Sequence, residues 1–379
     1  MGIKYTIQHI CLMVLLFDIV HSKCNRHNHP AFIPTPINVT SNDAFKRPAF
    51  AIGTDARQKF SNTDALVHVS TWYGATLLYN IYNKQALNIV KLPNTIAAMQ
   101  MCIGIPGILY NWVFNPGFRP RLTSKQQVIQ GKVPINTFKN SPSASILKQG
   151  AFNALSHGLS VYALSQGSPA MVHTIKSLEP LFTSTISYFS LGTKLPIGSY
   201  LSLIPIVAGV GLASYGGADI SKKAIYATLA ANLFSSLKNI EAKKFYANDI
   251  SGQNLTPSNV HTLVSLSSLL FLVPLSLSEY SSMDPLFRMA SKYNKTELFN
   301  FLKYVTLSGI AYNVYNRVSF LTLTALGPIT HAVANTFKRI FIIASSALLI
   351  DKKFSQNTAI GSALAVLGTL GYSLAKNLS

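Results

Sequence analysis

The chain has 379 residues, of which 49% are hydrophobic and only 12% are charged, and its mean hydropathy is +0.29. Lys and Arg number 32 against 12 Asp and Glu, a formal net charge of +20. Apolar blocks recur through most of the chain, so this composition excludes an ordinary soluble protein and predicts a membrane protein. The basic excess suits the lipid bilayer and an anionic small substrate, whereas no motif in the sequence indicates nucleic-acid binding.

The start of the chain has the composition of a two-part leader. Residues 1–23 combine the basic Lys4 with an apolar run, which is typical of a secretory signal peptide. Residues 24–62 are basic, poor in acids and rich in hydroxyl residues, which is typical of a transit-like presequence. Such a leader predicts a plastid membrane reached through the secretory pathway; the alternative is a secretory protein with a luminal tail. The leader also contains four residues with the spacing of metal ligands: His21, Cys24, His27 and His29. We expect no metal site there.

We expect residues 63–379 to form one transporter domain of ten helices, most of them separated by Pro or Gly. The expected helices are 66–90, 93–116, 146–166, 168–190, 196–216, 221–246, 257–278, 300–325, 328–350 and 356–376. A helix needs about 20 residues to cross a bilayer, and each of these ranges is at least that long. Short joints, such as the one at Gly327–Pro328, predict antiparallel neighbours.

The stretch from Pro328 to Ile350 carries Lys338 and Arg339 side by side within an apolar run. Cations at such a depth cost about 2.5–3.5 kcal/mol each on insertion scales. A structural role rarely repays that cost, so the pair predicts a site that meets an anion. The alternative is a helix that ends near Phe337, with the pair at the membrane interface.

A second apolar stretch, Ser168 to Leu191, repeats this pattern. Lys176 lies inside it, and His173 is three residues earlier on the same helix face. In the first stretch His331 precedes Lys338 by seven residues, again on one face. These histidines are candidates for neutral hydrogen-bond donors or for groups that sense protonation.

Matching residues recur at a nearly constant offset. Lys176 and Lys338 are 162 residues apart, and His157 and Tyr315 are 158 apart. This offset favours an internal duplication over chance similarity, and five helices per repeat require the second repeat to be inverted. The predicted fold is therefore an all-α membrane protein with ten transmembrane helices in two inverted five-helix repeats. The expected repeats cover residues 66–216 and 221–376.

Other polar residues inside the expected helices allow more than one interpretation. Lys238 is placed equally well to pair with Glu241 or to contact a ligand. Glu179 precedes Pro180, a combination that indicates a kink with a satisfied carboxyl group rather than a substrate contact. Tyr315 fits either a phosphate hydrogen bond or aromatic packing.

The best-placed cations are Lys176, Lys338 and Arg339, and three positive charges in a low-dielectric core suit a multiply charged anion such as phosphate. Arginine offers a fork to two oxygens, while lysine acts as a mobile point charge. An empty closed site would trap three unpaired cations. The empty carrier should therefore reorient slowly, which predicts obligatory exchange.

Five motifs carry a family resemblance: NIYNK (80–84), VHTIKSLEPLF (172–182), KNIEAKK (238–244), AYNVYNRVSF (311–320) and ITHAVANTFKRIFII (329–343). They resemble the plastidic phosphate translocators of the drug/metabolite transporter superfamily, over about residues 65–377. The resemblance implies a central site between two repeats. It also implies exchange of inorganic phosphate for phosphorylated three-carbon compounds, namely triose phosphate, 3-phosphoglycerate and phosphoenolpyruvate, without a cofactor.

The resemblance places the phosphate contacts at Lys176, Lys338 and Arg339. It places further substrate contacts at His157, Tyr315, Lys84 and Ser160. His173, Lys238 and His331 are additional candidates, because the histidines share helices with Lys176 and Lys338, and Lys238 lies deep in its own helix. Leu164 departs from the family pattern, and helix 221–246 is closer to phosphoenolpyruvate translocators, so both triose phosphate and phosphoenolpyruvate are expected substrates. The two-part leader resembles those of apicomplexan plastid proteins, which predicts an apicoplast-like membrane.

There are two alternatives to this function. A nucleotide-sugar antiporter of the secretory pathway shares the superfamily plan and would exchange a nucleoside monophosphate. A membrane-embedded enzyme would need metal-holding patterns such as His-Glu-x-x-His, which the sequence lacks, so no enzyme is expected.

Overall fold

A computed structural model describes residues 62–115, 142–215, 221–247, 257–282, 295–351 and 355–377, with a few isolated residues between them. All regular elements in these ranges are helical. The α-helices are α2 (Asn62–Ile89), α3 (Pro93–Ile103), α4 (Ile105–Phe114), α6 (Pro142–Gln166), α7 (Pro169–Lys176), α8 (Glu179–Leu191), α9 (Ile197–Leu201), α10 (Leu203–Tyr215), α11 (Lys222–Ala247), α12 (Pro257–Leu277), α14 (Lys295–Ser346) and α15 (Gln356–Asn377). A 3₁₀ turn covers Tyr280–Ser282 and a π-helical turn covers Ala347–Asp351. The predicted signal peptide 1–23 and presequence 24–62 lie outside the described residues, apart from Asn62.

Three of the expected helices are interrupted, and each break is followed closely by a proline. The chain breaks at Gly104 before Pro106, at Ser177–Leu178 before Pro180, and at Ser202 before Pro205. Proline has no backbone N–H and clashes with the carbonyl four residues earlier, so it ends or kinks a helix at these points. Local chemistry therefore cuts three predicted spans into the pairs α3–α4, α7–α8 and α9–α10.

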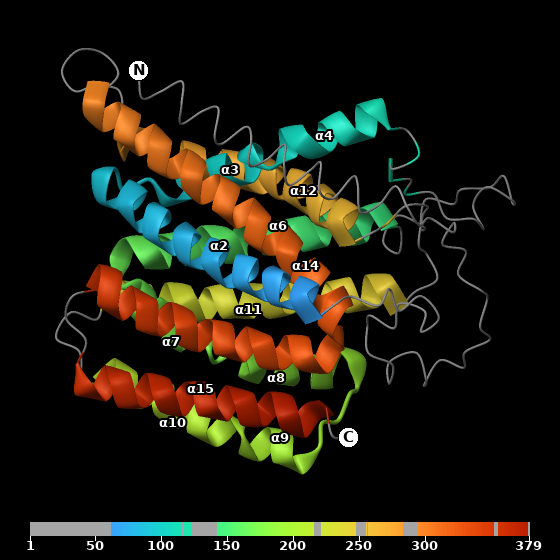
Figure 1. Cartoon of the computed structure of the whole chain (residues 1–379), viewed down its shortest axis with the longest axis vertical. Coiled ribbons are helices and arrows are strands. Elements are labelled where there is room, and N and C mark those ends of the chain that lie inside the picture. Colours follow the sequence, from blue (N-terminus) through green and yellow to red (C-terminus); the bar gives the residue numbers. More distant parts are fainter. Residues whose placement is uncertain are drawn as a thin grey trace, which may run out of the picture.

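Helix α14 differs from its prediction at Gly327–Pro328, where a break was expected and the backbone is helical throughout. The helix cannot be straight, however. Tyr304 stacks with Tyr82, and the Lys338 ammonium lies over Trp72. A straight helix would separate the two α14 residues by about 50 Å, whereas their partners on α2 are only about 15 Å apart. Helix α14 therefore bends back, so that its two halves both lie along α2 (Figure 1).

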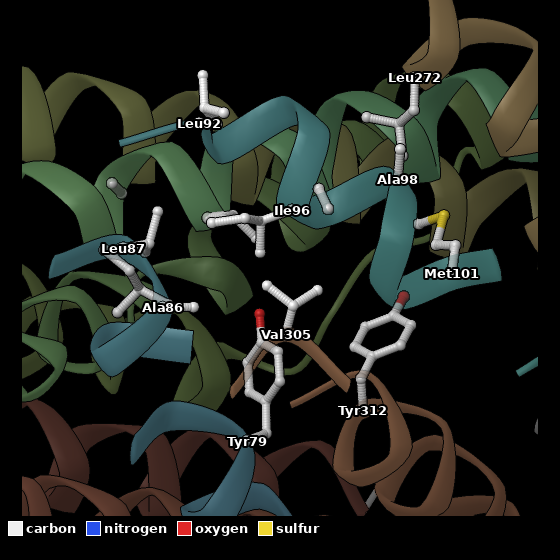
Figure 2. Packing of buried hydrophobic residues seen from close by; sticks show 14 of the residues in the cluster. Tyr79, Ala86, Leu87, Leu92, Ile96, Ala98, Met101, Leu272, Val305 and Tyr312 are labelled. Atoms are coloured by element: carbon white, nitrogen blue, oxygen red, sulfur yellow. The ribbon is translucent and has the colours of Figure 1, made fainter. Parts of the chain in front are cut away.

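The main core lies where α2, α3, α6, α12 and α14 meet (Figure 2). Leu87, Ile96, Val161, Leu272 and Val305 are all at most 1% exposed there. A second cluster joins α7, α10 and α15. Because lipid tails are as apolar as leucine, such helices associate in a membrane through close packing and hydrogen bonds rather than through the hydrophobic effect.

Four helical segments of the described chain are apolar and long enough to cross a membrane: Ile197–Tyr215, Asn259–Leu277, Thr330–Ile350 and Gln356–Lys376. Other long helices carry more polar residues. Helix α11, for example, has five lysines and one glutamate within 26 residues. Polar residues inside a membrane protein usually face the bundle interior, so we expect those of α11 to do so.

Helices α10 and α15 pack closely together at the lower side of the bundle in Figure 1. A Cβ atom added to Gly209 would lie 2.4 Å from the backbone nitrogen of Ala365. A Cβ atom added to Gly361 would lie 2.4 Å from the backbone nitrogen of Ala213. The two contacts are reciprocal, and each helix contributes one Gly-x-x-x-Ala motif, the pattern of small residues that lets membrane helices touch through their backbones.

Helix α3 takes its N-terminal cap from a distant part of the chain. Leu92 at its N-cap position makes no side-chain capping bond. Instead Glu279, just beyond α12, accepts hydrogen bonds from the backbone N–H groups of Asn94 at 2.8 Å and Thr95 at 3.0 Å. A carboxylate at this position satisfies two orphan donors and complements the helix dipole.

Candidate functional site

The break between α7 and α8 creates the centre of the candidate site. Pro180 cannot donate to the carbonyl of Lys176, four residues earlier, so that oxygen is left without its usual helical partner. Arg339 Nη1 donates a hydrogen bond to it. Two predicted cations that are 163 residues apart are thus brought together. Lys176 supplies the freed carbonyl oxygen, and Arg339 supplies the guanidinium group.

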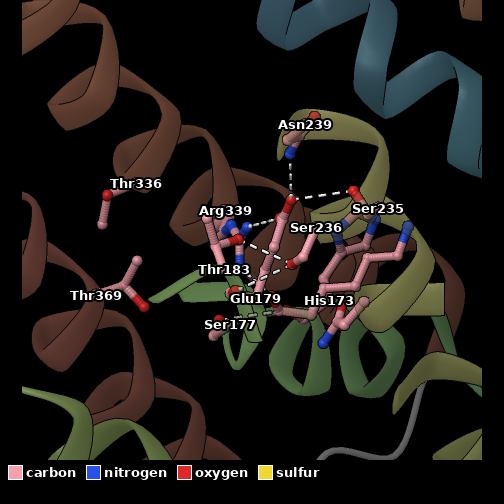
Figure 3. A network of polar contacts seen from close by, with 12 residues as sticks. His173, Ser177, Glu179, Thr183, Ser235, Ser236, Asn239, Thr336, Arg339 and Thr369 are labelled. Atoms are coloured by element: carbon pink, nitrogen blue, oxygen red, sulfur yellow. Dashed lines mark hydrogen bonds and ion pairs between the residues drawn. The ribbon is translucent and has the colours of Figure 1, made fainter. Parts of the chain in front are cut away.

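Glu179, the first residue of α8, forms an ion pair with Arg339, with 2.8 Å between Oε2 and Nη2 (Figure 3). Its Oε1 accepts from Ser235 Oγ at 3.1 Å and from Asn239 Nδ2 at 3.3 Å, both on α11. The interpretation of a kink with a satisfied carboxyl group is therefore confirmed. The expectation of three unpaired cations is wrong for Arg339, because a carboxylate 160 residues away balances its charge.

Lys176 and Lys338 differ from Arg339, because neither is in direct contact with a carboxylate in the described chain. Among the described residues, neither ammonium group has a hydrogen bond or a salt bridge. Lys338 Nζ instead lies 4.3 Å from the ring centroid of Trp72, in a cation–π contact. The Lys176 ammonium interacts electrostatically with Glu179 and Arg339, and Lys338 interacts with these same groups and with Lys176. The three predicted cations therefore form one cluster around a single carboxylate.

Lys238 on α11 adds a fourth positive charge near this cluster. Its pairing with Glu241, one of two expectations, is wrong: Lys238 Nζ donates to Asn153 Oδ1 at 3.3 Å. Glu241 instead accepts from Ser145 Oγ and lies 4.0 Å from Lys148. Lys238 also interacts electrostatically with Glu179 and with Lys176.

His157 lies in a second polar group, which is deeply buried beside the main core. Its Nε2 is 3.1 Å from Gln100 Oε1. The Gln100 amide nitrogen donates to Asn83 Oδ1 and to Ser308 Oγ, each at 2.9 Å. Because this amide nitrogen is already donating twice, its oxygen is the group left to accept, which assigns the proton to His157 Nε2.

His157 belongs to an aromatic cluster that contains three tyrosines. Its ring centroid is 4.3 Å from that of Tyr312, and Tyr79 and Tyr315 pack at 5.5 Å from each other. Tyr315 also meets Tyr312 edge to face. Of the two interpretations offered for Tyr315, the structure shows the aromatic packing; its contact with phosphate stays a prediction.

The other predicted contacts already have partners in the protein. Lys84 Nζ donates to the carbonyls of Leu164 and Gly167, each at 2.8 Å, and so satisfies the C-terminal end of α6. Ser160 Oγ donates to the carbonyl of Ser156. The side chain of His173 shares a 3.0 Å hydrogen bond with Asn80. His331 stacks on Trp72, with ring centroids 4.7 Å apart. Their roles as substrate contacts stay predictions.

The arrangement suits an anion better than a metal ion. Four cations and one carboxylate leave a net positive charge, and in the described chain no group of three or more His, Cys, Asp or Glu side chains could hold a metal. Cations buried in a membrane protein mark substrate pathways, and Arg with Lys is the usual pair for phosphate.

Sequence reasoning missed four residues of this neighbourhood: Trp72, Gln100, Ser235 and Asn239. Their only local signal is a polar or indole group inside a predicted span, and this signal does not identify a partner more than 50 residues away.

Comparison with known proteins fits this geometry. The profile of the Triose-phosphate Transporter family matches residues 63–373. The chain belongs to this family. As a triose-phosphate transporter family member it is a transport protein and not an enzyme, and the resemblance seen in the five motifs is confirmed.

The family member is similar to several curated plastid proteins. It is 28% identical over 342 residues to the chloroplastic triose phosphate/phosphate translocator of Flaveria pringlei, a match that covers 90% of this chain and 78% of the relative. It is 29% identical over 308 residues to the chloroplastic phosphoenolpyruvate/phosphate translocator 2 of Arabidopsis thaliana, covering 81% and 76%. It is 27% identical over 312 residues to the chloroplastic glucose-6-phosphate/phosphate translocator 2 of Arabidopsis thaliana, covering 82% and 74%.

Proposed function

We propose that this chain exchanges inorganic phosphate for phosphorylated three-carbon compounds across a plastid membrane. The observation that carries the proposal is the cluster of Lys176, Lys338 and Arg339 in a member of a family whose relatives are named as phosphate translocators. Triose phosphate, 3-phosphoglycerate and phosphoenolpyruvate share a phosphate group of the same charge and size, so one cationic cluster can serve both partners of the exchange.

The proposed architecture is ten spans in two inverted repeats, which alternate between two faces of the membrane. The reciprocal contacts of Gly209 with Ala365 and of Gly361 with Ala213 support it, because a pseudo-twofold axis would relate them. A second similarity between the expected repeats also supports it. Helix α2, the first of one repeat, packs along both halves of α14, and α11, the first of the other repeat, packs along α6 and along the pair α7–α8.

Exchange rather than uniport follows from the charges of the empty site. Arg339 has Glu179 as a partner, so the cost of closing an empty site falls on Lys176 and Lys338. Burying a cation without a partner costs roughly several kcal/mol, and a bound phosphate removes this cost because it pairs with the cation. The loaded carrier therefore reorients readily and the empty carrier slowly.

The choice of carbon partner rests on the neighbourhood of His157. An imidazole whose Nε2–H is held by Gln100 presents its other nitrogen, Nδ1, as a hydrogen-bond acceptor. Such an acceptor suits a substrate hydroxyl group, as in a triose phosphate or 3-phosphoglycerate. The similarity to a glucose-6-phosphate translocator is nearly as high as the others, so this sugar phosphate is a necessary competitor in the test.

The test is uptake of labelled phosphate by proteoliposomes that contain the purified chain. The lumen is preloaded in turn with phosphate, dihydroxyacetone phosphate, 3-phosphoglycerate, phosphoenolpyruvate, glucose 6-phosphate, a nucleoside monophosphate or buffer. Uptake that requires internal phosphate or a three-carbon phosphate supports the proposal. Equal uptake into buffer-loaded vesicles would indicate a uniporter, and exchange for the nucleotide alone would indicate a nucleotide-sugar antiporter.

Variants of the cluster sharpen this assay. Lys176→Met and Lys338→Met should each raise the KM for phosphate at least tenfold. The matched control is Lys148→Met, because this side chain is 51% exposed and lies away from the cluster. Unchanged exchange in both cluster variants would contradict the assignment of the site.

Plastid location is proposed from the names of the relatives, all of which are chloroplastic. An apicoplast-like plastid is proposed from residues 1–62 alone. A fluorescent protein fused to the C-terminus, after Ser379, would show whether the chain reaches a plastid or remains in the secretory pathway.

A further inference from the structure

Trp72 on α2 contacts two of the predicted functional side chains of α14. Its indole stacks on the imidazole of His331 with an interplanar angle of 11°, and Lys338 Nζ lies over the same indole. His331 and Lys338 are two helical turns apart, or about 10.5 Å along the helix axis. The His331 and Trp72 ring centroids are 4.7 Å apart and Lys338 Nζ lies 4.3 Å from the Trp72 ring centroid, so one indole contacts both side chains.

The indole is held firmly in this position. Trp72 is 1% exposed, and the hydroxyl of the next residue, Tyr73, donates to the carbonyl of Ala334 on α14. In the described part of the chain the indole Nε1–H has no hydrogen-bond partner. The indole N–H group of Trp72 therefore takes no part in its contacts with His331 and Lys338, which are made by the faces of the ring.

Lys338 needs a partner when no anion is present. Its ammonium interacts with the like charges of Arg339 and Lys176, while Glu179 is committed to Arg339. Among the described groups, Glu179 attracts this ammonium without forming a salt bridge to it, and the face of Trp72 is the group that contacts it. A cation–π contact of this kind is worth about two- to thirtyfold in an equilibrium constant, less than a charge-assisted hydrogen bond to phosphate in the same surroundings.

We propose that Trp72 is a positioning residue that holds the Lys338 ammonium in the empty carrier and yields it to the incoming anion. The inference rests on the proposed function, since it assumes that phosphate is the anion. The contact stabilises the empty state and competes with phosphate. Its loss should therefore tighten phosphate binding and slow phosphate release.

Tryptophan emission gives a direct readout, because the chain has only two tryptophans. The second, Trp112, donates to Asn259 on α12. In a Trp112→Phe variant, titration with inorganic phosphate should change the emission of Trp72 to saturation, because the ammonium leaves its face. Sodium chloride of equal ionic strength should not produce this change. Adding Lys338→Met to the variant should abolish it.

Exchange kinetics give the second readout. Trp72→Leu should lower the KM for phosphate about two- to thirtyfold and lower the maximal rate as well. Trp72→Phe, which keeps an aromatic face and more of the core volume, should lie between Leu and the native chain. A residue with only a packing role would lower the rate or raise the KM, and would not lower both.

The outcomes separate this inference from the proposed function. If the native chain exchanges phosphate but Trp72 emission does not respond, the inference is wrong and the function stands. The same holds if both Trp72 variants show a raised or unchanged KM. If Trp72→Leu does not fold, Trp72→Phe and the emission of the native Trp72 still decide the question. If the native chain takes up no phosphate, the proposed function itself fails.

Discussion

Glu179→Gln is the change that most directly tests how the cationic cluster is balanced. The native carboxylate pairs with Arg339 at 2.8 Å and accepts from Ser235 and Asn239 on α11. A glutamine side chain has one acceptor oxygen and one NH₂ group. Its NH₂ group would therefore face either the Arg339 guanidinium or the donors of Ser235 and Asn239, where two donors would oppose each other. The substitution also leaves the Arg339 charge without its partner.

The magnitude follows from the burial of the pair. Removing one partner from a fully buried ion pair costs about 3–5 kcal/mol. The side chain of Arg339 is 10% exposed and that of Glu179 is 27% exposed, so water screens part of the loss. We expect a destabilisation of about 2–3 kcal/mol, which corresponds to a decrease in melting temperature of about 4–6 °C at roughly 2 °C per kcal/mol.

Phosphate should reverse part of this loss. In Glu179→Gln the guanidinium is free to bind the anion, so phosphate should bind more tightly than in the native chain. Tenfold tighter binding would add about 1.4 kcal/mol of stabilisation at saturating phosphate. The assay is thermal unfolding in detergent, with and without phosphate.

The matched control is Glu241→Gln, on α11. This carboxylate lies 4.0 Å from a lysine that is 51% exposed, so its loss should cost less than about 1 kcal/mol, and phosphate should stabilise it as much as the native chain. If Glu179→Gln is as stable as this control, or if phosphate stabilises both variants equally, the balance of charges described for Arg339 is wrong.

Three further predictions concern other parts of the molecule. Gly209→Ala should lower the melting temperature of the solubilised protein by several degrees, whereas Gly211→Ala, where a Cβ meets nothing within 4 Å, should leave it unchanged or slightly higher. Glu279→Gln removes the charge that caps α3 and should cost about 1 kcal/mol in denaturant unfolding; a loss no larger than that of an exposed glutamate would refute the cap. Gln100→Leu frees His157 from its partner and should change the ranking of the organic partners in the exchange assay more than the phosphate–phosphate rate; an unchanged ranking would argue against a role of this pair in selectivity.

Much of the helical layout could be predicted from local signals. The prediction 257–278 corresponds to α12, Pro257–Leu277, because a proline at the first turn and an apolar run are both visible in the sequence. The kink at Glu179 was also predictable, since the following Pro180 cannot donate in a helix. Local chemistry did not show that the helical backbone continues through Gly327–Pro328, because tertiary packing along α2 decides how that bend is built.

The candidate site was predictable in its charges but not in its contacts. Lys176, Lys338 and Arg339 stand out because each is costly in an apolar stretch. Their partners lie far away in the chain, and no spacing rule connects Arg339 with Glu179 across 160 residues. The pairing of Lys238 with a neighbour on its own helix failed for the same reason, since a distant asparagine on α6 occupies it instead. Trp72 gave no signal, as an aromatic residue in an apolar helix is ordinary.

The seam between α10 and α15 has a mechanical consequence. Where two backbones touch at glycine and alanine, no side chain lies between them that could change rotamer, so the helices cannot slide past one another by small adjustments. Motion at this seam would require the two helices to separate, with loss of the whole contact. In the alternating access that we propose, this seam should therefore stay fixed while α7 and α14, which carry the cations, move against it.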